Sequence, residues 1–132
     1  MASRFDKSNG DVVNGLISGV EKILTSKSIQ YEIVRVAGAN EIPATIQHFF
    51  EKYPDKYSVA ISLGLIIKGD TDHYEMVRDS FTSGVTQLYL LYNTPIIQGV
   101  LACYTKKQAI ERKNLGEEFA HTALEMKKIK QL

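Results

Sequence analysis

The sequence of 132 residues has one cysteine, no marked excess of either charge and no long apolar run. A single cysteine, Cys103, excludes an intramolecular disulfide and a cysteine metal cluster, and it suits a reducing compartment. The 16 basic and 15 acidic side chains give a net charge of +1, which attracts neither nucleic acid nor a membrane surface. No apolar stretch approaches the roughly 20 residues of a membrane helix, and no secretory signal is visible. These absences predict a soluble cytoplasmic protein.

Several motifs of cofactor and metal sites are also absent. The sequence contains no G-x-x-x-x-G-K, G-x-G-x-x-G or G-x-S-x-G segment. This argues against a P-loop, a dinucleotide site and a serine hydrolase. No pair of histidine, cysteine or carboxylate residues has the spacing of metal ligands, so we expect no metal ion.

The sequence pattern predicts a single α/β domain. Hydrophobic residues make up 44% of it, enough for the core of a single domain covering residues 1–132. Helical periods alternate with short apolar runs. The expected helices are residues 12–26, 43–53, 73–92 and 106–130, and the expected strands are residues 31–36, 57–67 and 96–104. Such alternation predicts a parallel sheet with helices on both faces.

The start of the chain fits this pattern incompletely. Folds of this class usually open with a strand, whereas residues 1–5 supply at most the last residues of one. Two interpretations remain open: the sheet has three strands plus a stub, or the sequence lacks its natural beginning. We therefore predict a short parallel sheet whose first strand is truncated or absent.

Three turns follow the expected strands, at residues 38–43, 69–73 and 102–105. The carboxyl ends of parallel strands lie at one edge of the sheet, where open α/β folds bind ligands. The second turn leads into a helix N-terminus, whose unpaired N–H groups and dipole favour an anion such as phosphate. We therefore expect Thr71 and the neighbouring N–H groups to bind phosphate.

His73 is the strongest candidate for proton transfer, because an ordinary imidazole titrates near neutral pH. The residues alone leave open that His73 merely occupies the first helical turn. Asp70 and Asp72 either belong to the site or cap the helix, which is common for aspartate there. Arg112 either pairs with phosphate or is an ordinary solvated arginine. For Glu41, the alternative is plain turn chemistry.

Taken together, the three turns resemble the lumazine synthase family of riboflavin biosynthesis. Residues 38–43 match its Gly-Ala-x-Glu-Ile-Pro turn, and residues 69–73 match its Gly-x-Thr-x-His turn after a long apolar strand. Residues 95–101 match its Pro-x-x-x-Gly-Val-Leu strand, and residues 105–112 match Thr-x-x-Gln-Ala-x-x-Arg. Residues 4–5 resemble its Arg-Phe-Asn turn. Four motifs in order and at the right spacing make the match specific over nearly the whole chain.

The resemblance implies a flavodoxin-like three-layer αβα sandwich and a transferase without cofactor or metal. Members condense 5-amino-6-(ribitylamino)uracil with 3,4-dihydroxy-2-butanone 4-phosphate: an imine forms, phosphate is eliminated and the ring closes. The resemblance assigns proton transfer to His73. It assigns contacts with the two substrates to Phe5, Asn40, Glu41, Gly69, Asp70, Thr71, Gln98 and Arg112. Members of the family build the site between neighbouring subunits, so the resemblance also implies a homo-oligomer, either a pentamer or an icosahedral 60-subunit shell.

The chain departs from the family pattern at several positions. The family usually has an aromatic residue at the position of Asn40, and often one at the position of Gln98. In the family, the strand with the latter position contributes to the site of the neighbouring subunit. The segment after Arg112 is short, and the first strand is cut or absent. These departures keep a second hypothesis open: a catalytically weak or inactive shell subunit. A receiver-type signalling module is disfavoured, because Asp6 alone represents its acidic cluster.

Overall fold

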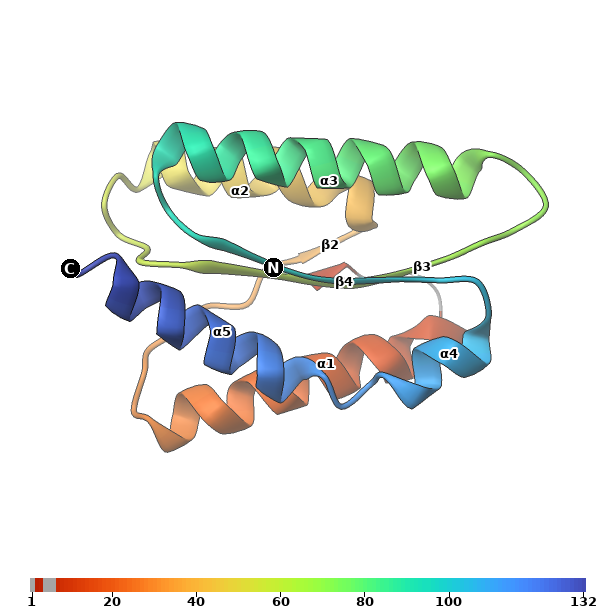
Figure 1. Cartoon of the computed structure of the whole chain (residues 1–132), viewed down its shortest axis with the longest axis horizontal. Coiled ribbons are helices and arrows are strands. Elements are labelled where there is room, and N and C mark those ends of the chain that lie inside the picture. Colours follow the sequence, from red (N-terminus) through yellow and green to blue (C-terminus); the bar gives the residue numbers. More distant parts are fainter. Residues whose placement is uncertain (1, 4–6) are drawn as a thin grey trace.

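Four parallel strands form one sheet in the order β2-β1-β3-β4, with helices on both faces (Figure 1). The computed structural model describes the backbone of residues 2–3 and 7–132, and the side chains from residue 10 onward. The strands are β1 (Ala2–Ser3), β2 (Arg35–Val36), β3 (Ala60–Ile67) and β4 (Ile96–Cys103). The helices are α1 (Lys7–Ser26), the 3-10 helix η1 (Ala39–Glu41), α2 (Ile42–Lys52), α3 (His73–Tyr92), α4 (Lys106–Glu111) and α5 (Gly116–Ile129). Across the described ranges, no helix combines the length and the apolar character needed to cross a membrane.

The long pair of β3 and β4 supports the rest of the fold. The two strands pair in parallel over their whole length, from Ala60 opposite Ile96 to Ile67 opposite Cys103. Both are apolar almost throughout, because helices cover both faces of a parallel sheet. The two polar residues are Gln98, which is exposed, and Ser62, whose buried hydroxyl donates a 2.8 Å hydrogen bond to the carbonyl of Ile97. The polar group is therefore satisfied within the core.

The sheet separates two hydrophobic cores. On one face, α1 and α5 pack against the strands through a cluster that includes Leu16, Val20 and Leu101. On the other face, η1, α2 and α3 form a cluster that includes Ile42 and Phe81. Figure 1 shows α2 and α3 above the sheet and α1, α4 and α5 below it. This arrangement confirms the predicted flavodoxin-like three-layer αβα sandwich.

The first strand is present as a stub of two residues. β1 lies between β2 and β3, where Ala2 pairs with Arg35 on one side and with Leu63 on the other. Ser3 pairs with Val36. The sheet therefore has three further strands and this two-residue stub.

The second strand is shorter than the predicted residues 31–36. Only Arg35 and Val36 form hydrogen bonds of a ladder, because their partner β1 consists of two residues, Ala2 and Ser3. A strand is held by the hydrogen bonds that its neighbour supplies. Residues 31–34 therefore continue as irregular chain, although their side chains favour a strand.

The last helix is predicted as one segment over residues 106–130, but it is two helices separated by residues 112–115. A Cβ added at Gly116 would lie 2.0 Å from the carbonyl oxygen of Leu16, and one added at Gly19 would lie 2.8 Å from the amide nitrogen of Glu117. The backbones of α1 and α5 therefore cross in close contact. Because this crossing fixes where α5 begins, the chain turns after α4 instead of continuing as one helix.

Candidate active site

The turn at residues 69–72 connects β3 to α3 at the carboxyl edge of the sheet. At its start, the amide of Lys68 donates a 2.9 Å hydrogen bond to the carbonyl of Cys103, which extends the ladder with β4. At its end, the amide of Met76 donates to the carbonyl of Asp72 at 3.1 Å and begins the helix. All residues from 68 to 73 are exposed. The turn is thus open to a ligand from outside.

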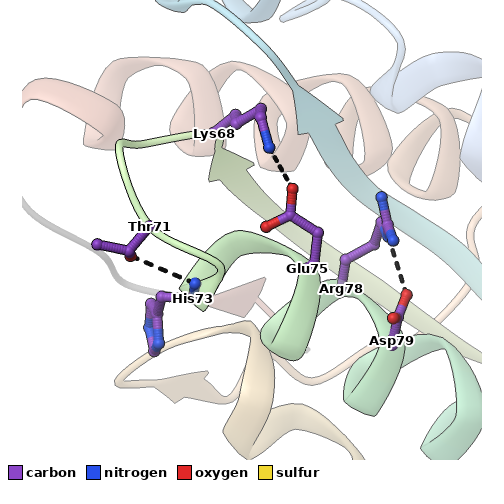
Figure 2. A network of polar contacts seen from close by, with 6 residues as sticks. All are labelled: Lys68, Thr71, His73, Glu75, Arg78 and Asp79. Atoms are coloured by element: carbon purple, nitrogen blue, oxygen red, sulfur yellow. Dashed lines mark hydrogen bonds and ion pairs between the residues drawn. The ribbon is translucent and has the colours of Figure 1, made fainter.

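Thr71 and His73 lie together in this turn, as predicted. The amide of His73 donates a 3.3 Å hydrogen bond to the hydroxyl oxygen of Thr71 (Figure 2). Asp72 occupies the N-cap position, as the capping alternative expects, but its carboxylate makes no capping hydrogen bond. A helix N-terminus without a carboxylate cap keeps N–H groups available for an anion.

Two charged residues that the sequence analysis did not identify flank the same turn and form an ion pair. Lys68 forms an ion pair with Glu75, seven residues later in the first turn of α3 (Figure 2). The hydrogen bond from Lys68 lowers the pKa of the Glu75 carboxyl, and the same contact raises the pKa of Lys68. Both groups are therefore charged at neutral pH. The Lys68 amino group also lies 5.5 Å from the ring centre of the buried Tyr74.

The first predicted turn is built on η1, directly after β2. Ala39 is buried in the core beneath α2 and α3, whereas Asn40 and Glu41 are exposed. η1 packs against α3 and β3, so it holds these two side chains beside the helix that His73 begins. An added Cβ at Gly84 of α3 would lie 2.8 Å from the Pro43 ring, so the start of α2 approaches α3 closely.

The third turn follows β4 and is organised by a capping box. The amide of Gln108 donates to the Thr105 hydroxyl at 3.2 Å, and the amide of Thr105 donates to the Gln108 side chain at 3.3 Å. The Thr-x-x-Gln spacing of this motif therefore has a structural cause, since it starts a helix. That helix, α4, leads to Arg112 at its C-terminus.

Arg112 is exposed near the carboxyl end of β4. Its guanidinium donates a 2.9 Å hydrogen bond to the carbonyl of Gln108 and lies 3.8 Å from the carboxylate of Glu111. Burial raises the pKa of the Cys103 thiol, and the nearby charge of Arg112 opposes part of that rise. These contacts place Arg112 at the ligand edge of the sheet, but on its β4 side.

Gln98 does not join the other candidates within one chain. It is exposed on β4 and pairs with Ser62 of β3. Ser62 precedes the last residue of β3 by five positions, a distance of about 16 Å along a strand. Gln98 therefore lies near the opposite end of the sheet from Thr71 and His73. Phe5 lies outside the described residues.

Comparison with known proteins identifies the family. The model of the 6,7-dimethyl-8-ribityllumazine synthase family matches residues 2–131. The chain is 37% identical to the 6,7-dimethyl-8-ribityllumazine synthase of Leuconostoc mesenteroides, over 96% of this chain and 83% of that protein. It is 33% identical to the Beijerinckia indica enzyme of the same name, over 92% of this chain and 70% of that protein. For the Prochlorococcus marinus enzyme the identity is 37%, over 89% and 80%. The chain therefore belongs to the 6,7-dimethyl-8-ribityllumazine synthase family.

Proposed function

We propose that this chain is a lumazine synthase. It condenses 5-amino-6-(ribitylamino)uracil with 3,4-dihydroxy-2-butanone 4-phosphate and releases 6,7-dimethyl-8-ribityllumazine and phosphate. The observation that carries this proposal is the exposed turn before α3, where Thr71 and His73 meet at a helix N-terminus in a member of this family. The turn has the two groups that the reaction needs, an anion-binding backbone and a titratable imidazole.

The turn at residues 69–72 and Arg112 bind the substrate phosphate. The N–H groups around Gly69 and Asp70 and the hydroxyl of Thr71 face an anion that approaches the helix N-terminus. Arg112 adds a planar guanidinium, which pairs with phosphate oxygens through two parallel hydrogen bonds. Its present bond to the Gln108 carbonyl uses one nitrogen and leaves further donors for the ligand. Gripping the leaving phosphate from two sides stabilises the charge that develops on elimination.

Proton transfer falls to His73. Imine formation requires that the amine lose protons and that the ketone oxygen leave as water, and elimination removes another proton from carbon. The exposed imidazole in the first turn of α3 accepts and returns these protons. The protein otherwise acts by alignment, which lowers a two-reactant barrier by about 7–11 kcal/mol when the geometry is good.

Phe5, Asn40 and Glu41 contact the pyrimidine and its ribityl chain. Gln98 of a neighbouring subunit completes this part of the site. Asn40 and Glu41 are exposed on η1 beside α3, within the same chain as His73. Gln98 lies about 16 Å before the end of β3 along the sheet of its own chain, and the turn lies beyond that end, so Gln98 serves a site only across a subunit contact. We therefore propose a site shared between adjacent subunits of a pentamer.

Exposed apolar residues support this assembly. On α3, Met76 and Leu90 are 67% and 75% exposed, and Ser83 lies between them at seven-residue spacing, which places all three on one stripe. Tyr104 beside β4 is 65% exposed. Methionine and aromatic residues are enriched at surfaces that contact another protein. A pentamer, or twelve pentamers closed into a 60-subunit shell, would cover them.

A turnover assay tests the proposed function. The purified protein is incubated with both substrates, and lumazine absorbance and released phosphate are followed together. We expect equal amounts of both products, at a rate proportional to protein and above the rate without protein. Omitting either substrate should abolish both signals. If no lumazine forms beyond the background, the enzyme proposal is wrong and the inactive shell subunit replaces it.

A further inference from the structure

The residues at 69–72 form a turn that almost nothing packs against. An added Cβ at Gly69 would have no described atom within 4 Å, and every residue from 68 to 73 is exposed. Yet a phosphate site of backbone N–H groups works only if those groups converge on one point. The conformation of the turn therefore depends on contacts at its two ends.

Those ends are joined by side chains. Lys68 precedes the turn and is fixed to β4 by its own amide, while Glu75 follows it in the first turn of α3. The ion pair between them spans the turn from strand to helix (Figure 2). The pair is semi-enclosed: the Lys68 and Glu75 side chains are 41% and 31% exposed. One carboxylate oxygen of Glu75 is shielded from solvent and has no hydrogen-bond partner among the described residues, so Lys68 is the main counter-charge of this group.

We propose that Lys68 and Glu75 are positioning residues, which hold the turn at residues 69–72 in the shape that receives the substrate phosphate. This inference rests on the proposed function of the same turn. Neither residue needs to touch the substrate. Lys68 is committed to Glu75, and Glu75 carries the wrong charge for a phosphate ligand. Their effect is conveyed through the backbone N–H groups between them.

The charge of Glu75 makes the idea sharply testable. A carboxylate near a phosphate site repels the ligand, and Asp70 and Asp72 already add negative charge to this turn. If Glu75 acted by charge alone, Glu75→Gln would free Lys68 and tighten phosphate binding. If Glu75 holds the turn, the same variant weakens binding. The two explanations predict opposite signs.

Asp79 offers a matched control on the same helix. Its carboxylate pairs with the neighbouring Arg78 at 2.9 Å and does not span the turn (Figure 2). Asp79→Asn therefore removes one negative charge and one ion pair without releasing the turn. We expect its phosphate affinity and its KM values to stay within about twofold of the parent, as for an exposed surface pair.

The experiment measures two quantities for the parent, Glu75→Gln, Lys68→Met, the double variant and Asp79→Asn. The first is the Kd of inorganic phosphate by calorimetry, which needs no turnover. The second is the KM for each substrate. We expect each single variant to weaken phosphate binding and to raise KM for the phosphate substrate by about tenfold, within the hundredfold cost of a 1 Å misplacement. The double variant should be no worse than either single one, because both break one contact.

Several outcomes would overturn the inference. Tighter phosphate binding in Glu75→Gln, additive losses in the double variant, or an equal rise in KM for the uracil substrate would each contradict it. Exchanging the charges, with Lys68→Glu and Glu75→Lys together, should recover part of the lost affinity; failure of this exchange to improve on Lys68→Glu alone also contradicts it. If the parent makes no lumazine but phosphate binding follows the expected pattern, the proposed function fails while the positioning role stands.

Discussion

At the scale of single residues, the proposal depends most on the imidazole of His73. We expect His73→Ala to lower kcat about 100-fold or more, the usual contribution of a positioned acid or base. Initial rates with both substrates at saturating concentration measure this effect.

His121 is the matched control for this prediction, because it is an exposed histidine on α5, far along the chain from the turn. His121→Ala should keep the rate of the parent. If His73→Ala retains full turnover across neutral pH, the imidazole does not transfer protons.

The sequence predicted the turn that carries Thr71 and His73, because strand, glycine and helix follow one another in a recognisable order. It did not reveal Lys68 and Glu75. A lysine before a turn and a glutamate after it are ordinary at that spacing, and only the path of the chain brings them into contact. The sequence also did not explain the spacing of Thr105 and Gln108. The structure shows that these two residues form the capping box of α4.

At the scale of elements, the crossing of α1 and α5 depends on Gly116. An alanine there would place its Cβ 2.0 Å from the Leu16 carbonyl oxygen, which is backbone and has little freedom to move. We expect Gly116→Ala to lower the free energy of unfolding by about 3 kcal/mol, the upper end of the usual cost of overpacking. Urea denaturation measures the change.

Gly10 in α1 provides the control, since an added Cβ there meets no described atom within 4 Å. Gly10→Ala should raise the free energy of unfolding by about 0.5–1 kcal/mol, because alanine favours a helix over glycine. Equal effects of the two substitutions would show that the helices do not cross as described.

The Lys68–Glu75 pair predicts a pH dependence of stability. The folded chain lowers the pKa of Glu75 below its ordinary value of 4.5, through its hydrogen bond with Lys68. A lowered carboxyl pKa stabilises the fold above the ordinary value, and this contribution disappears as the pH falls through the lower folded value. The parent should therefore lose its advantage over Glu75→Gln as the pH falls from 6 to 3.

Urea midpoints at each pH measure this advantage, which is small because the pair is partly exposed. A difference between parent and variant that stays constant down to pH 3 would contradict the pairing. The pKa of Lys68 is raised above its ordinary value of 10.5 by its hydrogen bond with Glu75. Its contribution to stability is therefore lost only as the solution becomes strongly alkaline.

Two element predictions were wrong for the same reason: a segment's own pattern does not include its neighbours. Residues 31–34 favour a strand, but β1 supplies a ladder only to Arg35 and Val36. The helical pattern after β4 is continuous, but the close contact between Gly116 and Leu16 fixes a separate start for α5. Where both neighbours extend along the element, as for β3 and β4, the predicted strands were confirmed within a few residues.

At the scale of the whole molecule, we expect a defined oligomer of at least five chains, since the proposed site needs a neighbour. Sedimentation should give at least about five times the 14.8 kDa of one chain. Replacing Met76 and Leu90 together with lysine adds charge to the exposed α3 stripe and should shift the mass downward. Lysine at the exposed His121, by contrast, should leave the mass unchanged.

A monomeric parent protein would leave Gln98 without a site to serve and would contradict the shared arrangement. A parent oligomer that withstands both lysine substitutions would keep the assembly and reject α3 as its contact surface.

Subunit complementation tests the central claim, a lumazine-forming site shared by two chains, most directly. The proposed site takes His73 from one chain and Gln98 from the adjacent chain, so His73→Ala and Gln98→Lys, which puts a charged side chain at the pyrimidine contact, are each expected to be nearly inactive. Refolded together in equal amounts, they should form mixed oligomers in which about a quarter of the sites combine an intact His73 with an intact Gln98 from the adjacent chain. We predict that the mixture makes lumazine at about a quarter of the parent rate. A mixture no more active than the variants assayed separately, with the parent fully active, would contradict the account.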